Sequence, residues 1–142
     1  MRVCLFGDSI LDNTIWLRNP QNTVESQIRT ALGPSVELQD YTIDGLTAED
    51  MLKRPNCQTR LYFSMHRALQ RMPPYALLNN YSEVPPHEAA VLSIGGNDVR
   101  KYLRRRAGHR QWSAFLRMLR KRIAQVVQQL LAPGRAGRLV LI

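Results

Sequence analysis

Four short segments with the composition of β-strands recur along this chain, and helical patterns separate them. The segments are residues 1–6, 36–42, 89–94 and 139–142. Strands that alternate with helices favour a parallel sheet, because a parallel connection has to carry the chain back across the sheet and usually does so through a helix. The order strand, helix, strand, helix, strand, helix, strand therefore predicts an α/β fold with right-handed crossovers.

The predicted strands differ in how many of their faces are covered. In residues 36–42 apolar and polar side chains alternate, which predicts one buried face and places Tyr41 on the polar face with Glu37. Residues 89–94 are apolar throughout, as expected for a strand that is covered on both faces. The sheet should therefore carry helices on both sides.

Capping residues and periodicity predict where the helices lie. Thr23 can cap a helix that Gly33 ends, and Thr47 can cap a second helix with acids in its first turn. From Trp112 to Leu130 apolar residues recur at steps of three and four, which predicts a long amphipathic helix.

The length of 142 residues is that of one domain, residues 1–142, with an irregular, proline-punctuated insertion at about 53–88. No apolar run approaches the roughly 18 residues that a membrane span needs. The first residues are typical of a strand rather than a signal peptide. These features lead us to expect a cytoplasmic protein without a membrane span.

The net charge of +9 is concentrated in one part of the sequence. Residues 99–122 hold ten of the 20 Lys and Arg and no acid, whereas the rest of the chain has ten basic and eleven acidic residues. Such a segment suits nucleic acid, an anionic membrane surface or an acidic partner. A solvated basic helix face explains the same pattern without a partner.

Polar motifs follow the first three predicted strands. They are Gly7-Asp8-Ser9, Asp44-Gly45 and Gly95-Gly96-Asn97-Asp98. Ligand and catalytic sites of parallel α/β sheets form beyond the carboxyl ends of the strands, so the topology brings all three motifs to one edge. Each motif alone is also ordinary turn chemistry. Their agreement on one edge indicates a functional site.

In this order the motifs resemble those of the SGNH hydrolases, also called GDSL esterases and lipases. The resemblance runs from residue 1 to the end of the chain and rests on G-D-S-I, on the glycine after the second strand and on G-G-N-D. The continuation L-D-N at residues 11–13 is similar to bacterial members. The resemblance implies a three-layer, flavodoxin-like α/β sandwich with a parallel sheet.

The resemblance also implies a role for each motif in the cleavage of a small-molecule carboxylic ester. Ser9 would be the nucleophile, and the oxyanion hole would consist of the Ser9 N–H, the Gly45 N–H and the Asn97 amide. These types of residue suit the task, because preorganised N–H donors stabilise the negative charge of a tetrahedral intermediate. No cofactor and no metal is expected.

Other residues of the motifs should support this site. Glycine at position 45 would let the backbone approach closely, and Gly95 with Gly96 would allow the torsions that turn Asn97 inward. Asp8, Asp12 and Asp98 suit hydrogen bonds that cap the loops. These supporting residues, together with Gly7, complete the predicted site.

The general base is the missing part of the predicted site. In SGNH hydrolases a late D-x-x-H block supplies it, and this chain has no D-x-x-H. Its histidines are His66 in the insertion, His87 just before the third strand, and His109 after the basic helical stretch that follows Asp98. A solvated surface position is the expectation for all three. We expect that the sequence stops before the block, inside a strand that the resemblance implies to be central.

Two functions therefore stay open. The chain is an ester hydrolase or a fragment of one, or it is a non-catalytic or truncated protein of the same fold that binds an anionic partner through the basic segment 100–122.

Overall fold

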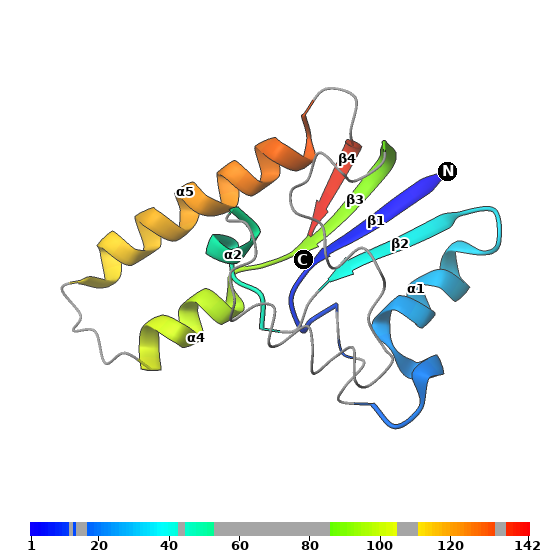
Figure 1. Cartoon of the computed structure of the whole chain (residues 1–142), viewed down its shortest axis with the longest axis horizontal. Helices are drawn as coiled ribbons and strands as arrows, with labels where there is room; N and C mark the ends of the chain where they lie inside the picture. The colour runs from blue at the N-terminus through cyan, green and yellow to red at the C-terminus, as the bar shows by residue number, and fades with distance from the viewer. Residues whose placement is uncertain (12, 14–16, 43–44, 53–85, 105–110, 133–135) are drawn as a thin grey trace.

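A computed structural model of the chain describes residues 1–11, 13, 17–42, 45–52, 86–104, 111–132 and 136–142 (Figure 1). Its four strands are β1 (Arg2–Gly7), β2 (Glu37–Thr42), β3 (His87–Ser93) and β4 (Ala136–Leu141). They form one sheet in the order β2-β1-β3-β4, and all three pairings are parallel. The predicted α/β fold with a parallel sheet is confirmed.

Helices connect the strands in the predicted order. They are η2 (Pro20–Asn22, a 3-10 turn), α1 (Val24–Leu32), α2 (Ala48–Leu52), α4 (Gly96–Arg104) and α5 (Trp112–Leu130). Much of the insertion predicted at 53–88 lies outside the described residues, and so do residues 105–110.

The register aligns the carboxyl ends of the three strands that precede the polar motifs. Gly7 of β1 is paired with Thr42 of β2 and with Ser93 of β3. The chain therefore leaves the sheet at the same level after β1, β2 and β3, which is the condition for their following loops to meet.

One face of the sheet is covered by α2 and α5, which lie on the same side of it (Figure 1). Cys4 and Phe6 of β1 and Leu92 of β3 pack there against Met51 and Val126 of these helices. Six residues of this face are at most 1% exposed: Cys4, Phe6, Ala90, Leu92, Val126 and Leu130. Burial of an aliphatic or aromatic side chain contributes about 1.5–3 kcal/mol, so this face holds much of the stability.

The opposite face of the sheet is covered by α1. Val24, Ile28 and Leu32, at helical spacing, pack against a cluster that contains Val3 and Leu38. The sheet therefore lies between helices on both sides.

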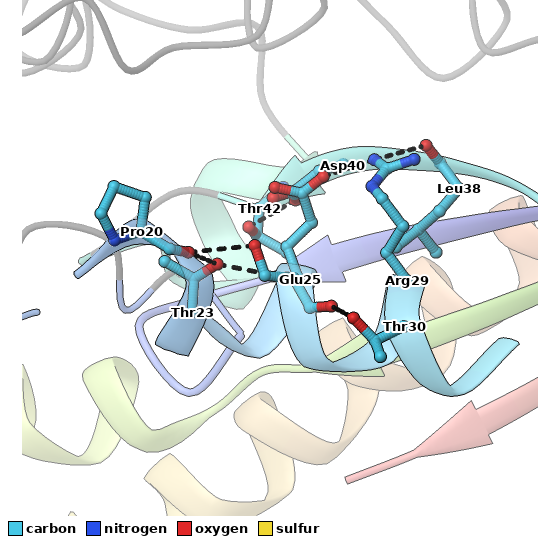
Figure 2. A network of polar contacts seen from close by, with 9 residues as sticks. Pro20, Thr23, Glu25, Arg29, Thr30, Leu38, Asp40 and Thr42 are labelled. Carbon is cyan, nitrogen blue, oxygen red and sulfur yellow. Dashed lines mark hydrogen bonds and ion pairs between the residues drawn. The ribbon is translucent and has the colours of Figure 1, made fainter. Parts of the chain in front are cut away.

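A polar network fixes the register of α1 on β2 (Figure 2). The Arg29 guanidinium donates to the Leu38 carbonyl at 3.2 Å and pairs with Glu25 one turn earlier. The Thr23 hydroxyl accepts from the Ser26 N–H at 3.1 Å, which is the predicted N-cap. Amphipathic packing and capping thus agree on where α1 begins.

Two further helix predictions are confirmed. The Thr47 hydroxyl accepts from the Asp50 N–H at 3.1 Å, and the Asp50 carboxylate accepts from the Thr47 N–H at 3.0 Å. This reciprocal pair starts α2 as a capping box does. In α5 the buried residues are Phe115, Leu119, Val126 and Leu130, which belong to the predicted series of apolar residues at steps of three and four.

Some local predictions were wrong. Tyr41 was expected on a polar face of β2, but it is buried and stacks on Phe6 with ring centroids 5.2 Å apart. The reason is that Tyr41 belongs to the same buried cluster as Phe6, Leu46 and Met51, so this end of β2 is covered on that face as well. β3 begins at His87, so the last two residues of the insertion expected at about 53–88 belong to the strand.

His87 was expected at the surface, and this was also wrong, since only 4% of the residue is exposed. Its ring lies 5.8 Å from the ring of Phe6, centroid to centroid. It was expected just before the third strand and is the first residue of β3, so its backbone lies at the amino end of the sheet, as predicted.

Gly7 should be indispensable to this fold. A Cβ on Gly7 would lie 1.9 Å from the Ser93 carbonyl oxygen, and φ at this residue is +130°. We expect Gly7→Ala to lower the free energy of unfolding by roughly 2–6 kcal/mol, because it combines backbone strain with overpacking against a neighbouring strand. Urea denaturation measures this change.

Gly33→Ala is the matched control for that substitution. Gly33 also has a positive φ, +74°, but no described atom lies within 4 Å of its Cβ position. It should lose only about 1–3 kcal/mol, from the positive-φ backbone alone. Equal losses at both positions would show that the contact with Ser93 does not matter.

Candidate functional site

The first motif leaves the sheet through a buried turn. Beyond Gly7 the Asp8 N–H donates to the Ser93 carbonyl at 3.0 Å, and the Leu11 N–H donates to the Asp8 carbonyl at 3.0 Å. The Asp8 carboxylate, in a residue only 2% exposed, accepts from the Ser93 hydroxyl at 3.2 Å and from the Ile10 N–H at 3.3 Å. Ser9 follows in the turn and is partly exposed. The turn thus buries Asp8 and leaves Ser9 accessible.

The second motif turns the chain from β2 into α2. Gly45 has φ +81°, and no described atom lies within 4 Å of its Cβ position. Packing among the described residues therefore does not require glycine at this position, and the expected close approach of its backbone to a substrate stays a prediction. The backbone conformation itself favours glycine, because a residue with a side chain is strained at this φ. Leu46, Thr47 and Ala48 are buried directly afterwards.

The third motif belongs to a helix rather than to a loop. Gly95 has φ +116°, and α4 begins at the next residue. Asn97 and Asp98 were expected in a loop but lie in the first turn of α4, 7% and 6% exposed. Only the first glycine of the pair has a positive φ, so Gly95 alone supplies the torsion that turns the chain.

Contacts connect the three motifs to one another. A Cβ on Gly96 would lie 3.8 Å from Asp8 Oδ2, so the first and third motifs are neighbours. The Asn97 amide Nδ2 donates to the Leu46 carbonyl at 3.1 Å, which links the third motif to the second. The Ala48 N–H donates to Asp98 Oδ2 at 2.8 Å, which makes a second such link. The predicted convergence at the carboxyl edge is thus present in the backbone and the supporting residues.

Ser9 itself takes no part in these links. Within the described ranges, its side chain forms no hydrogen bond with Asn97 or with a histidine. The structure brings the motifs of Ser9, Gly45 and Asn97 together. That Ser9, Gly45 and Asn97 act together as nucleophile and oxyanion hole stays a prediction.

Asp98 is the most perturbed acid of the site. Burial raises the pKa of its carboxyl above the ordinary 3.8, while the Ala48 N–H and the charge of Arg122 lower it and the charge of Asp50 raises it. Desolvation outweighs the stabilising contacts. The N–H of Ala48 is the first of α2, so the carboxylate also meets the positive end of that short helix.

Ser93 is a residue of this site that the sequence analysis missed. It was counted in an apolar strand, yet its hydroxyl and its carbonyl both bond to Asp8. The residue is completely buried. The signal was present, since a serine in an otherwise apolar strand needs a polar partner.

The described residues leave the general base unassigned. His87 lies at the amino end of β3, and His66 and His109 lie outside the described residues, as does Asp12. Cys4 is no alternative nucleophile, because burial raises the pKa of its thiol to about 12.

A cavity of about 610 Å³ lies at the other, amino edge of the sheet. Its lining includes Arg2, Glu37 and Glu88. Arg2 is already paired with Glu37 at 2.9 Å, and this contact lowers the pKa of the Glu37 carboxyl. The charged side chains of this cavity are already paired with one another, so fewer polar groups are left to bind a ligand than at the carboxyl edge.

Comparisons with known proteins give no independent identification. No protein-family model, no curated protein and no solved structure matches the chain. Within the described ranges, no helix is long and apolar enough to cross a membrane, and no group of three or more His, Cys, Asp or Glu could hold a metal ion.

The raised pKa of Asp98 predicts how stability varies with pH. The folded protein holds this proton more tightly than the unfolded chain, so the protonated acid stabilises the fold below its ordinary pKa of 3.8. That contribution is lost as the pH rises through the higher folded pKa. The Asp98→Asn side chain cannot ionise but keeps an acceptor for the Ala48 N–H. We expect the stability of this variant relative to the wild type to increase as the pH rises.

Urea denaturation of both proteins at about pH 4 and at about pH 7 measures the effect. The difference in free energy of unfolding should increase with pH. A difference that stays constant would mean that Asp98 titrates at its unfolded pKa.

Proposed function

We propose that this protein is a serine hydrolase of the SGNH type that cleaves small carboxylic esters. Ser9 is the nucleophile, and the oxyanion hole consists of the Ser9 N–H, the Gly45 N–H and the Asn97 amide. The observation that carries the proposal is the pair of hydrogen bonds between the third motif and the residues after the second: the Asn97 amide donates to the Leu46 carbonyl, and the Ala48 N–H donates to the Asp98 carboxylate. If the motifs were only independent turns, nothing would require buried hydrogen bonds between them.

The sheet supports the same proposal. The order β2-β1-β3-β4 matches the first four strands of flavodoxin-like sheets, in which ligands bind beyond the carboxyl ends of the strands. Helices on both faces fit a three-layer sandwich of this kind.

Asn97 is suited to hold an oxyanion because its side chain is buried and oriented. One N–H of its amide donates to the Leu46 carbonyl, and an amide has a second N–H. No described residue accepts from that second donor, which leaves it for the carbonyl oxygen of an ester. A donor that is already fixed in place loses no free energy to reorganisation when the charge develops.

The reaction follows from these roles. The Ser9 hydroxyl oxygen bonds to the ester carbonyl carbon while its proton passes to a base, and the carbonyl oxygen takes up the negative charge. Collapse of this intermediate expels the alcohol, which receives the proton, and leaves an acyl-serine. Water then hydrolyses the acyl-serine to the acid and restores Ser9.

The test is hydrolysis of short-chain aryl esters by the 142-residue chain, with and without added imidazole. Imidazole can accept the Ser9 proton from solution when no side chain does so. We expect it to accelerate turnover by the wild type well beyond its effect on Ser9→Ala. Ser113→Ala, which removes an exposed serine of α5, is the matched control and should behave as the wild type.

A fluorophosphonate probe should label Ser9 under the same conditions. Asn97→Ala should lower the Ser9-dependent rate by about 10²–10³, as expected for the loss of one oxyanion donor. Thermal unfolding of each variant separates lost chemistry from lost structure. Ser9-dependent turnover without imidazole would assign the base to His66 or His109. If neither turnover nor labelling depends on Ser9 in either buffer, the proposal is wrong.

A further inference from the structure

The surface of α5 that faces away from the protein carries a group of cations, Arg117, Arg120 and Lys121, which we call the α5 stripe. All three are exposed, whereas Phe115 and Leu119 of the same helix are buried. At 100° per residue the three cations fall on one side of the helix, opposite the buried residues. The proposed esterase does not use them.

The fold does not explain the α5 stripe. No carboxylate of the described residues pairs with these three cations. Arg117 and Lys121 are four residues apart, and like charges at that spacing cost a helix about 0.2–0.5 kcal/mol. The last turn of α5, where the helix dipole favours cations, holds none. The α5 stripe therefore slightly destabilises the helix, and no ion pair or dipole interaction among the described residues offsets this.

Nearby cations behave differently. Arg122 pairs with Glu49 of α2 at 2.9 Å, and Lys101 of α4 is 3.4 Å from Asp50. The two acids of α2 are thereby occupied by cations on the inner side of the helices. Residues 99–142 contain no Asp or Glu at all. No acid close in sequence is therefore available to the stripe.

From these observations we propose that the α5 stripe binds the phosphate backbone of nucleic acid. Its three cations lie within about 6 Å along the helix axis. Nucleic acid offers a comparable charge density, about one phosphate per 3.4 Å of each strand. Arg forms bidentate hydrogen bonds with phosphate, and two of the three cations are Arg.

The same face is ill suited to a membrane surface. A helix that lies in a membrane needs a continuous apolar face, and that of α5 is buried against the protein. Leu116 and Met118 are exposed, 42% and 40%, but they flank the stripe on opposite sides of the helix. Ser113 and Gln128 continue the stripe along the helix as exposed polar residues.

The test measures binding of the full chain to a fluorescent mixed-sequence duplex DNA and to a single-stranded RNA, over a series of salt concentrations. The test variant is Arg117→Gln with Lys121→Gln. The matched control is Arg18→Gln with Arg138→Gln, two exposed cations outside α5. Each pair lowers the net charge from +9 by two, so both proteins attract polyanions equally at long range.

We expect the test variant to lose about tenfold or more in affinity near 0.1 M salt. Its plot of log affinity against log salt should become shallower by about 1.8 for duplex DNA, or about 0.9 per lost phosphate contact. The control should lose much less and keep its slope. Thermal unfolding should be unchanged in both, because exposed cations contribute little to stability.

Three results would overturn the proposal. Equal losses in the two variants would mean that net charge, and not the stripe, attracts the nucleic acid. No measurable binding to either nucleic acid would exclude this ligand. Stripe-dependent binding that is tighter to polyglutamate, or to vesicles containing phosphatidylserine, would assign the surface to an acidic protein or a membrane. None of these results depends on Ser9, so the proposed esterase is tested separately.

Discussion

The close approach of β1 and β3 at their carboxyl ends is the constraint on which the candidate site depends. Gly7 lies so near Ser93 that a Cβ would sit 1.9 Å from the Ser93 carbonyl oxygen. Directly beyond this contact the Asp8 N–H bonds to that same carbonyl, and the Ser93 hydroxyl bonds to the Asp8 carboxylate. The direction in which the chain leaves β1 is thereby fixed, and with it the position of the Ser9 turn.

Buried hydrogen bonds carry this order from one motif to the next. Asp8 lies beside Gly96 at the start of α4, and the following Asn97 and Asp98 bond to the backbone of the second motif. A buried polar group without a partner costs about 1–3 kcal/mol, so each of these contacts is held firmly. Rigid donors of this kind are what an oxyanion site requires, and the buried Asp98 shows that the arrangement has an electrostatic cost.

The charged residues on and around α5 separate into two groups with different surroundings. The acids of α2 neutralise Lys101 and Arg122, which join α2 to α4 and α5. The cations on the outward side of α5 have no such partner among the described residues. The stripe lies on α5 and the carboxyl edge is formed by other elements, so the binding proposed for the one and the chemistry proposed for the other can be tested separately.

The sequence by itself determined the features that depend on neighbouring residues. The caps at Thr23 and Thr47 and the periodicity of α5 predicted the helices, because these signals act within a few residues along the chain. Only the tertiary structure decided the burial of Tyr41 and His87, the role of Ser93 and the link from Asn97 to Leu46. The bonds of Ser93 and Asn97 join residues 85 and 51 positions apart. Local propensity cannot predict contacts between residues so far apart in the sequence, because these contacts depend on how distant segments pack and exclude water.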